Sequence, residues 1–180
     1  MGGHSITNQA PSPWIFRFSG LAQGPVLDVA CGAGRHAALF AGRGHKVTAV
    51  DRNLSRLGDL RDLANITALE ADLEKEPAPW RPEPGAWGTV VVANYLWRPL
   101  LPALVAALAP GGVLLYETFA VGNGKYGKPS NSDFLLRPGE LLDAVSGQLQ
   151  VVAYEHGETP SPAVVQRICA IRSEAPVALT

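Results

Sequence analysis

The sequence predicts an α/β protein in which a mostly parallel sheet lies between two layers of helices. From Val26 onward, short apolar runs rich in β-branched residues alternate with helical patterns, and such crossovers join parallel strands with helices on both faces. Near the end, two strand candidates are joined only by the Pro-containing segment 159–162, so they must be antiparallel to each other. With 180 residues, we expect a single domain over residues 1–180.

The first half of the chain supplies three of the predicted strands. Residues 1–24 carry prolines and clustered aromatic residues, which predict an irregular or short helical arm. Leucines at 54, 57, 60 and 63 predict an amphipathic helix over 53–65 that begins with an Asn53 cap. The remaining predictions are strands over 25–32, 45–51 and 66–73, and a helix over 35–44 that ends at Gly42 or Gly44.

The second half continues the pattern with a weaker third crossover. Four prolines within 74–86 predict mostly loop there, and the strand over 87–96 reads as the buried middle of a parallel sheet. The Gly-rich segment 121–136 is expected to be a substrate lid. The remaining predictions are helices over 98–110, with Pro102 near its first turn, and 137–147, and strands over 111–120, 149–158 and 163–173.

Composition and charge argue against several classes of function. Hydrophobic residues make up 47% of the chain and charged residues 17%, with a net charge of -1, which offers no electrostatic footprint for nucleic acid. No apolar run approaches the roughly 20 residues of a membrane span, and the start lacks a signal-peptide pattern. The two cysteines and four histidines show no metal-binding spacing. We therefore expect a cytoplasmic protein with no metal site, no nucleic-acid partner and no membrane partner.

A glycine-rich loop follows the first predicted strand. Gly32, Gly34 and Ala37 match the loose dinucleotide pattern, and Asp51 ends the next strand where a ribose-binding acid is expected. Taken alone, this fits a nicotinamide-dependent oxidoreductase as well as other nucleotide-binding proteins. Two further acids help to distinguish between these classes of nucleotide-binding protein. Asp28 could meet the α-amino group of an amino-acid moiety or hold the loop through backbone hydrogen bonds, and Asp72 could accept a hydrogen bond from an adenine amine.

Together these features resemble the Rossmann-like (class I) S-adenosylmethionine-dependent methyltransferases, from about Val26 to Ser173. The family's glycine motif is matched by LDVACGAGR, its segment after strand four by ANYLW, and its turn before strand five by LAPGG. Ala30 departs from the family, which most often has glycine there. The CGAGRHA start and the compact size are most similar to the small methyltransferases related to tellurite-resistance proteins.

The resemblance implies a three-layer sandwich around a seven-stranded sheet of order 3-2-1-4-5-7-6, with strand seven antiparallel. It also implies S-adenosylmethionine as the cofactor and places the arm 1–24 over the cofactor site. Arg35 could pair with the methionine carboxylate, although a solvent-facing arginine fits the sequence equally well. The expected cofactor-binding residues are Asp28, Ala30, Gly32, Gly34, Arg35, Asp51, Arg52, Asp72, Leu73, Ala93, Asn94 and Tyr95.

The expected function is methyl transfer from S-adenosylmethionine to a small-molecule acceptor by in-line displacement. Such a transfer needs a base only if the nucleophile is protonated at neutral pH. No catalytic residue is assigned, and the candidates are His36, Tyr95 and Glu117. The alternatives are a catalytically inactive S-adenosylmethionine-binding module, acting as a sensor or subunit, and, more distantly, a nicotinamide-dependent oxidoreductase. The acceptor and the oligomeric state are left open.

Overall fold

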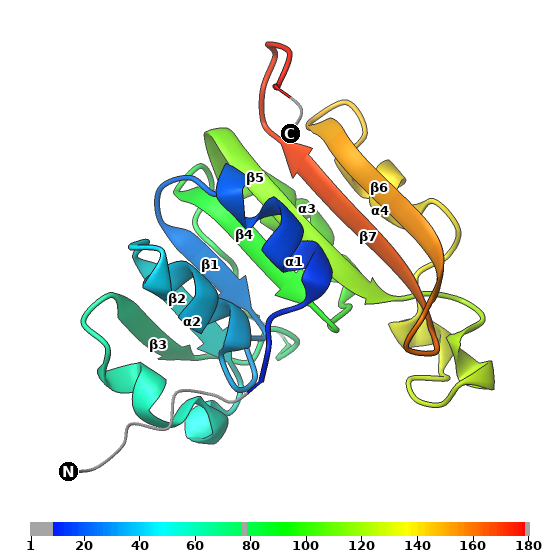
Figure 1. Cartoon of the computed structure of the whole chain (residues 1–180), viewed down its shortest axis with the longest axis horizontal. Coiled ribbons are helices and arrows are strands. Elements are labelled where there is room, and N and C mark those ends of the chain that lie inside the picture. The colour runs from blue at the N-terminus through cyan, green and yellow to red at the C-terminus, as the bar shows by residue number, and fades with distance from the viewer. Residues whose placement is uncertain (1–8, 77–78, 179–180) are drawn as a thin grey trace.

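The computed structural model describes residues 9–76 and 79–178 of the chain. These residues form a sheet with helices packed on both faces (Figure 1). Each strand lies at a segment predicted to be one. The strands are β1 (Val26–Val29), β2 (Val47–Asp51), β3 (Ile66–Glu70), β4 (Trp87–Ala93), β5 (Leu108–Phe119), β6 (Gln150–Thr159) and β7 (Ala163–Ile171).

The strand order is β3-β2-β1-β4-β5-β7-β6, as predicted. The pairs from β3 across to β5 are parallel, whereas β7 is antiparallel to both β5 and β6. The reversal follows from chain length, because residues 160–162 between β6 and β7 are too few for a crossover. The strands β1 and β4 lie at the centre and are buried on both faces.

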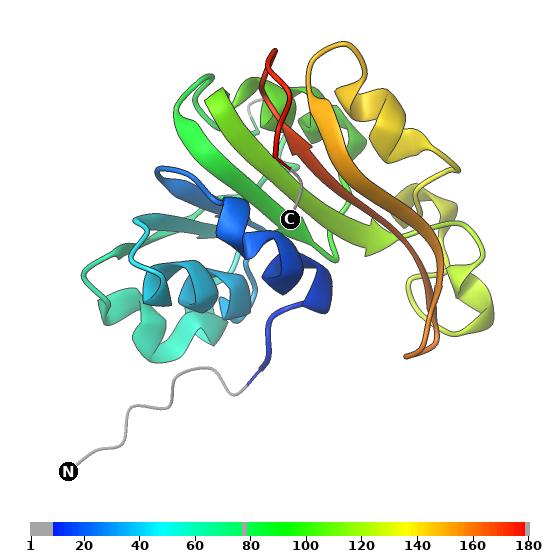
Figure 2. The same ribbon diagram turned by 45° about the horizontal axis from the view of Figure 1, so that its top comes forward.

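The helices form the two outer layers, which confirms the predicted three-layer sandwich (Figures 1 and 2). One face carries α1 (Pro13–Phe18) and α2 (Arg35–Gly42), and the other carries α3 (Leu101–Ala106) and α4 (Glu140–Val145). A hydrophobic cluster fills each interface, with Trp14, Phe40 and Leu115 in the first and Leu104, Tyr116 and Leu141 in the second. The 3-10 turns are η1 (Ser19–Leu21), η2 (Leu54–Asp62), η3 (Arg98–Leu100), η4 (Asn123–Lys125) and η5 (Ser132–Phe134).

The predicted N-terminal arm contains the short helix α1. The Ser12 hydroxyl caps this helix by accepting hydrogen bonds from the amides of Trp14 and Ile15, and Pro13 takes the first helical position. The Trp14 side chain is buried, and its indole N–H donates to the Ile168 carbonyl at 3.3 Å. Residues 1–8 of the arm lie outside the described residues.

The prediction of an α-helix over 53–65 is wrong. The segment forms the 3-10 turns of η2, which are broken at Gly58 by non-helical angles of φ 53° and ψ -136°. Glycine adopts a positive φ without the steric penalty of a side chain, so the break falls there. The Asn53 cap is confirmed, since its side chain accepts from the Ser55 amide at 2.9 Å.

The boundaries around β5 and α4 also differ from the prediction. The helix predicted over 98–110 is the turn η3 followed by α3, with Pro102 in its first turn, and it ends at Ala106. The strand β5 begins at Leu108 rather than at 111, because Leu108 already pairs with Trp87 before a register shift. The helix α4 is shorter than the predicted range 137–147, because Gly139 precedes it with a φ of 76°.

Candidate functional site

A cavity of about 630 Å³ opens where β1, β2, β3 and β4 end. A smaller cavity of about 220 Å³ adjoins it. Because Ala30, Gly32, Arg56 and Asn94 line both, the two cavities form one continuous site. Ligands of open α/β sheets bind at this edge, outside the carboxyl ends of the strands.

Two non-glycine residues with positive φ border this site. Among the described residues, Ala30 and Asn94 are the non-glycine residues with positive φ, at 53° and 56°. They directly follow β1 and β4, which are neighbours in the sheet. Asparagine tolerates the left-handed region, whereas alanine is strained there. Backbone strain of this kind concentrates at ligand sites. Ala30 occupies the position at which the methyltransferases that the sequence resembles most often have glycine.

The two loop glycines lie in different surroundings. At Gly32, with φ 56°, an added Cβ would meet no atom within 4 Å, so the space above it is open cavity. At Gly34, with φ 75°, an added Cβ would lie 2.6 Å from Leu57 Cδ2 and 2.8 Å from Leu60 Cδ1. Gly34 lines neither cavity. Its lack of a side chain allows η2 to pack against the start of α2.

Acidic side chains line the larger cavity at two strand ends. Asp51 accepts hydrogen bonds from the amides of Gly32 at 2.9 Å and Asn53 at 3.0 Å, and so ties the end of β2 to the glycine loop. Asp72 accepts from the Glu74 amide at 2.9 Å. Both residues line the cavity together with Arg52 and Leu73. These residues place hydrogen-bond acceptors beside a space large enough for a nucleoside.

Asp28 lies in the smaller cavity and is 1% exposed. Its carboxylate accepts from the Ala37 amide at 2.9 Å, so it holds the first turn of α2 rather than the glycine loop that it was expected to hold. Burial raises the pKa of Asp28 to about 7, against the lowering effects of the Ala37 amide and Arg35. Arg35 and Ala93 line the same cavity, and Arg35 also donates to the Ala10 carbonyl at 3.5 Å.

Two of the three catalytic candidates are engaged in other contacts. His36 is 3% exposed, and its Nε2 accepts from the Ser12 amide at 3.1 Å, which joins the arm to α2. Burial, with a contribution from Arg35, lowers the pKa of His36 to about 4, so the ring is neutral at pH 7. Glu117 lines neither cavity and forms an ion pair with Arg167 at 2.9 Å.

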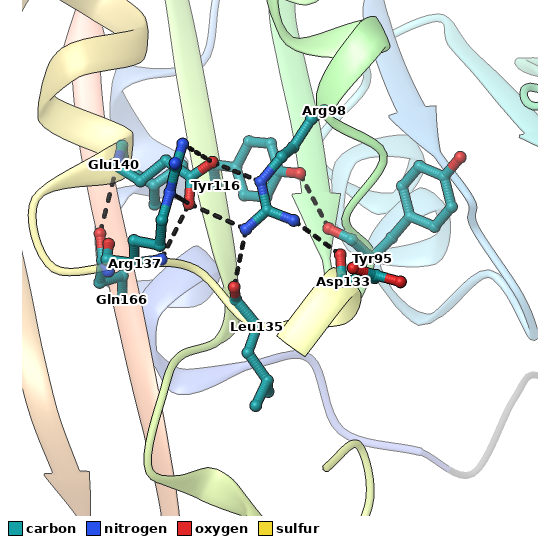
Figure 3. Close-up of polar contacts among 9 residues, drawn as sticks. Tyr95, Arg98, Tyr116, Asp133, Leu135, Arg137, Glu140 and Gln166 are labelled. Carbon is teal, nitrogen blue, oxygen red and sulfur yellow. Dashed lines mark hydrogen bonds and ion pairs between the residues drawn. The ribbon is translucent and has the colours of Figure 1, made fainter. Parts of the chain in front are cut away.

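Tyr95, the third candidate, lies in the larger cavity. Its hydroxyl donates to Glu74 Oε1 at 3.1 Å. Its carbonyl accepts from the Tyr116 hydroxyl at 2.8 Å (Figure 3). Burial and the neighbouring Glu74 raise the pKa of Tyr95, so its hydroxyl stays protonated. The side chain can therefore shape the cavity but cannot readily accept a proton.

Several lining residues were missed from the sequence. Thr118 follows Glu117 and faces the opposite side of β5, so strand alternation could have indicated it. Pro129 and Phe134 belong to the predicted lid 121–136, and the bridge between Ala120 and Leu136 folds that segment back to the strand end. The other residues missed are Asn53, Arg56, Ala71, Glu74, Leu96 and Phe119 in the larger cavity and Gln9, Cys31 and Ala33 in the smaller.

Metal sites and membrane-spanning helices, both of which the sequence argued against, can be checked in the described residues. In the described part of the chain, no three His, Cys, Asp or Glu side chains cluster as metal ligands would. Over residues 9–76 and 79–178, none of the helices is long and apolar enough to cross a bilayer.

The strand order and the site at the ends of β1 to β4 define a Rossmann-like protein with the class I methyltransferase fold. Residues 26–112, slightly less than half of the chain, match the family model described as a methyltransferase domain. The solved structure of TehB from Haemophilus influenzae is similar, with a TM-score of 0.68 and 16% identity over 92% of this chain and 63% of that one. S-adenosylmethionine is the cofactor that this class uses, as predicted.

Curated relatives match about half of the chain. Trans-aconitate 2-methyltransferase of Paracidovorax citrulli is 37% identical over 101 residues, which are 51% of this chain and 37% of the relative. Malonyl-[acyl-carrier protein] O-methyltransferase of Salmonella typhimurium is 35% identical over 103 residues, which are 54% of this chain and 40% of the relative. The match thus spans less than half of the length of either relative.

Proposed function

We propose that the protein transfers the methyl group of S-adenosylmethionine to a small-molecule acceptor by in-line displacement. The observation that carries this proposal is the continuous cavity at the carboxyl ends of β1 to β4, which is lined by all of the predicted cofactor residues except Gly34. When bound, S-adenosylmethionine supplies an electrophilic methyl group that its sulfonium already activates. The protein then has to bind it, align the acceptor and exclude water.

The charges of the lining residues fit this cofactor. Asp51 can accept hydrogen bonds from ribose hydroxyls and Asp72 from the adenine amine, because both carboxylates border the larger cavity. Asp28 and Arg35 border the smaller cavity and suit an α-amino group and a carboxylate. The open space over Gly32 lies between them and leaves room for the chain that joins nucleoside to amino acid.

The acceptor would lie on the opposite side of the larger cavity. There Thr118, Phe119, Pro129 and Phe134 form a wall that is mainly apolar. His36 and Glu117 are engaged away from this wall, which favours an acceptor that needs no deprotonation by the protein. Both curated relatives are named for acceptors that carry carboxylates, which are ionised at neutral pH. Small di- and tricarboxylates are therefore the first acceptors to assay.

Calorimetry tests the cofactor first. We expect S-adenosylmethionine and S-adenosylhomocysteine to bind the purified protein and NADH not to bind, and the reverse would refute the proposal. A screen for products heavier by one methyl group then tests the transfer. A cytoplasmic location and the lack of a nucleic-acid partner stay predictions.

A cofactor-binding module without catalysis is the second candidate. The observation that favours it is the engagement of His36 by the Ser12 amide and of Glu117 by Arg167, which leaves neither candidate free to act as a base. Any methylated product formed by the protein, and not by an Asp51→Ala variant, would exclude this candidate.

A further inference from the structure

A single guanidinium connects the segment after β4 to the segment before α4. Arg98, at the start of η3, donates from Nε to Glu140 Oε1 at 2.7 Å and from Nη2 to Glu140 Oε2 at 3.0 Å (Figure 3). The same guanidinium donates to the carbonyls of Asp133 at 2.8 Å and Leu135 at 2.8 Å. We call Arg98 and Glu140 together the clamp.

The clamp holds the backbone on both sides of Phe134. Asp133 and Leu135 are the immediate neighbours of Phe134, and both of their carbonyls accept from Arg98. Phe134 lines the larger cavity together with Pro129, and its side chain is 47% exposed, so few side-chain contacts hold it in place. The position of this wall therefore depends on the hydrogen bonds to its backbone.

The carboxylate of the clamp is itself fixed to the core. Glu140 accepts from the Arg137 amide at 2.8 Å, and its side chain is only 8% exposed. Gln166 on β7 donates to the Arg137 carbonyl at 2.6 Å and accepts from the Leu141 amide, which anchors the start of α4. Burial would raise the pKa of Glu140, but the hydrogen bonds from Arg98 and Arg137 lower it to about 2. The group is thus a permanent anion at neutral pH.

The other end of the clamp belongs to the segment that borders the nucleoside side. Arg98 follows Tyr95 by three residues, and the Tyr116 hydroxyl fixes the Tyr95 carbonyl. Arg98 itself lines neither cavity. It can therefore affect the acceptor wall without touching the cofactor or the acceptor.

We propose that Arg98 and Glu140 are positioning residues that hold Phe134, and with it one part of the acceptor wall, at the distance that acceptor transfer requires. This inference rests on the proposed function. It predicts that the clamp governs the use of the acceptor and has little influence on cofactor affinity. A small misplacement of an aligning group can lower turnover about 100-fold, which sets the scale of the expected loss.

The test compares Arg98→Ala, Arg98→Lys and Glu140→Gln with the control Arg137→Ala. Arg137 contacts the same carboxylate from a side chain that is 72% exposed, at 3.4 Å, and donates to neither carbonyl beside Phe134. Each variant is titrated with S-adenosylhomocysteine by calorimetry. Hydrogen exchange is then followed at the amides of Leu135 and Leu136 in the saturated protein, and kcat and KM are measured with the acceptor that the product screen returns.

Arg98→Ala and Glu140→Gln should keep their affinity for S-adenosylhomocysteine, exchange faster at Leu135 and Leu136, and lose about 10- to 100-fold in kcat/KM for the acceptor. Arg98→Lys should recover part of that loss, because a lysine keeps the charge but cannot span both carbonyls and the carboxylate. Arg137→Ala should resemble the wild type.

The inference fails if the wild type binds S-adenosylhomocysteine but exchange and acceptor kinetics are unchanged in Arg98→Ala. It also fails if cofactor affinity falls as much as kcat/KM, because the clamp would then be a general structural support. A wild type that does not bind S-adenosylhomocysteine refutes the proposed function itself, so the two failures can be told apart.

Discussion

At the scale of the residue, Asp28 combines two demands that oppose each other. The carboxylate holds the first turn of α2 through the Ala37 amide, yet it is 1% exposed. Burial penalises its charged form, and its pKa is accordingly raised from 3.8 to about 7. An acid with a raised pKa favours folding most at low pH, and that contribution disappears as the pH rises through the pKa of the folded state.

We therefore predict that Asp28→Asn makes the protein more stable at pH 8 and weakens cofactor binding. The amide oxygen can still accept from the Ala37 amide, and the buried charge is gone, so the gain should be on the order of 2–4 kcal/mol at pH 8 and small at pH 4. Urea unfolding at both pH values measures the gain, and calorimetry with S-adenosylhomocysteine measures the loss.

Asp59→Asn, on the exposed side of η2, serves as the control and should change neither property. Equal stabilisation at pH 4 and pH 8 would contradict the proposed origin in a buried charge. If Asp28→Asn leaves the affinity for S-adenosylhomocysteine unchanged, Asp28 stabilises the start of α2 and does not contribute to cofactor binding.

At the scale of the element, η2 shows how a spacing can be misread. Leucines at 54, 57, 60 and 63 recur every three residues, which is the period of a 3-10 helix, whereas an α-helical face alternates spacings of three and four. Leu57 and Leu60 are buried, but Leu63 is 40% exposed. The central strands β1 and β4 were predictable because their apolar runs are covered on both faces, and the site residues at their ends were predictable with them. Pro129 and Phe134 lie in the segment predicted to be a lid. Their position at the site, like that of Phe119, depends on the tertiary pairing of Ala120 with Leu136, for which a single sequence carries no local signal.

The packing of η2 on α2 predicts different effects for the two loop glycines. Either alanine would be strained at its positive φ, by about 1–2 kcal/mol. Gly34→Ala should be the more destabilising, because its Cβ would also displace Leu57 and Leu60. Gly32→Ala should keep more stability but lose cofactor binding, because its Cβ would enter the cavity.

Thermal unfolding and calorimetry with S-adenosylhomocysteine distinguish the two variants. Gly42→Ala is a suitable control, since an alanine there would meet no atom within 4 Å and the residue lines neither cavity. The interpretation is wrong if Gly32→Ala binds the cofactor as the wild type does, or if Gly34→Ala is as stable as Gly32→Ala.

At the scale of the whole molecule, three buried groups set the dependence of stability on pH. The pKa of His36 is lowered from 6.5 to about 4, so its contribution falls as the pH drops below 6.5. The pKa of Asp28 is raised from 3.8 to about 7, so its contribution falls as the pH rises over nearly the same range. These effects have similar size and opposite sign. The pKa of Glu140 is lowered from 4.5 to about 2, so its contribution is lost only in acid.

We predict a free energy of unfolding that is nearly constant between about pH 4.5 and 6.5 and falls steeply below pH 4. The loss attributable to Glu140 should be on the order of 2–3 kcal/mol, and Glu140→Gln should flatten the acid limb. Asp28→Asn should uncover a rise in stability from pH 4 to 6.5 that is due to His36. Urea unfolding at half-unit pH intervals measures the free energy of unfolding as a function of pH. A maximum narrower than one pH unit in the wild type would contradict the prediction.

The two walls of the larger cavity come from different stretches of the chain. The match to the methyltransferase domain ends at residue 112, whereas Thr118, Phe119, Pro129 and Phe134 all lie beyond it. In the proposed function, the first stretch holds the methyl donor and the second faces the acceptor. Exchange of the segment between β5 and α4 would then change the choice of acceptor and leave the residues around the methyl donor in place.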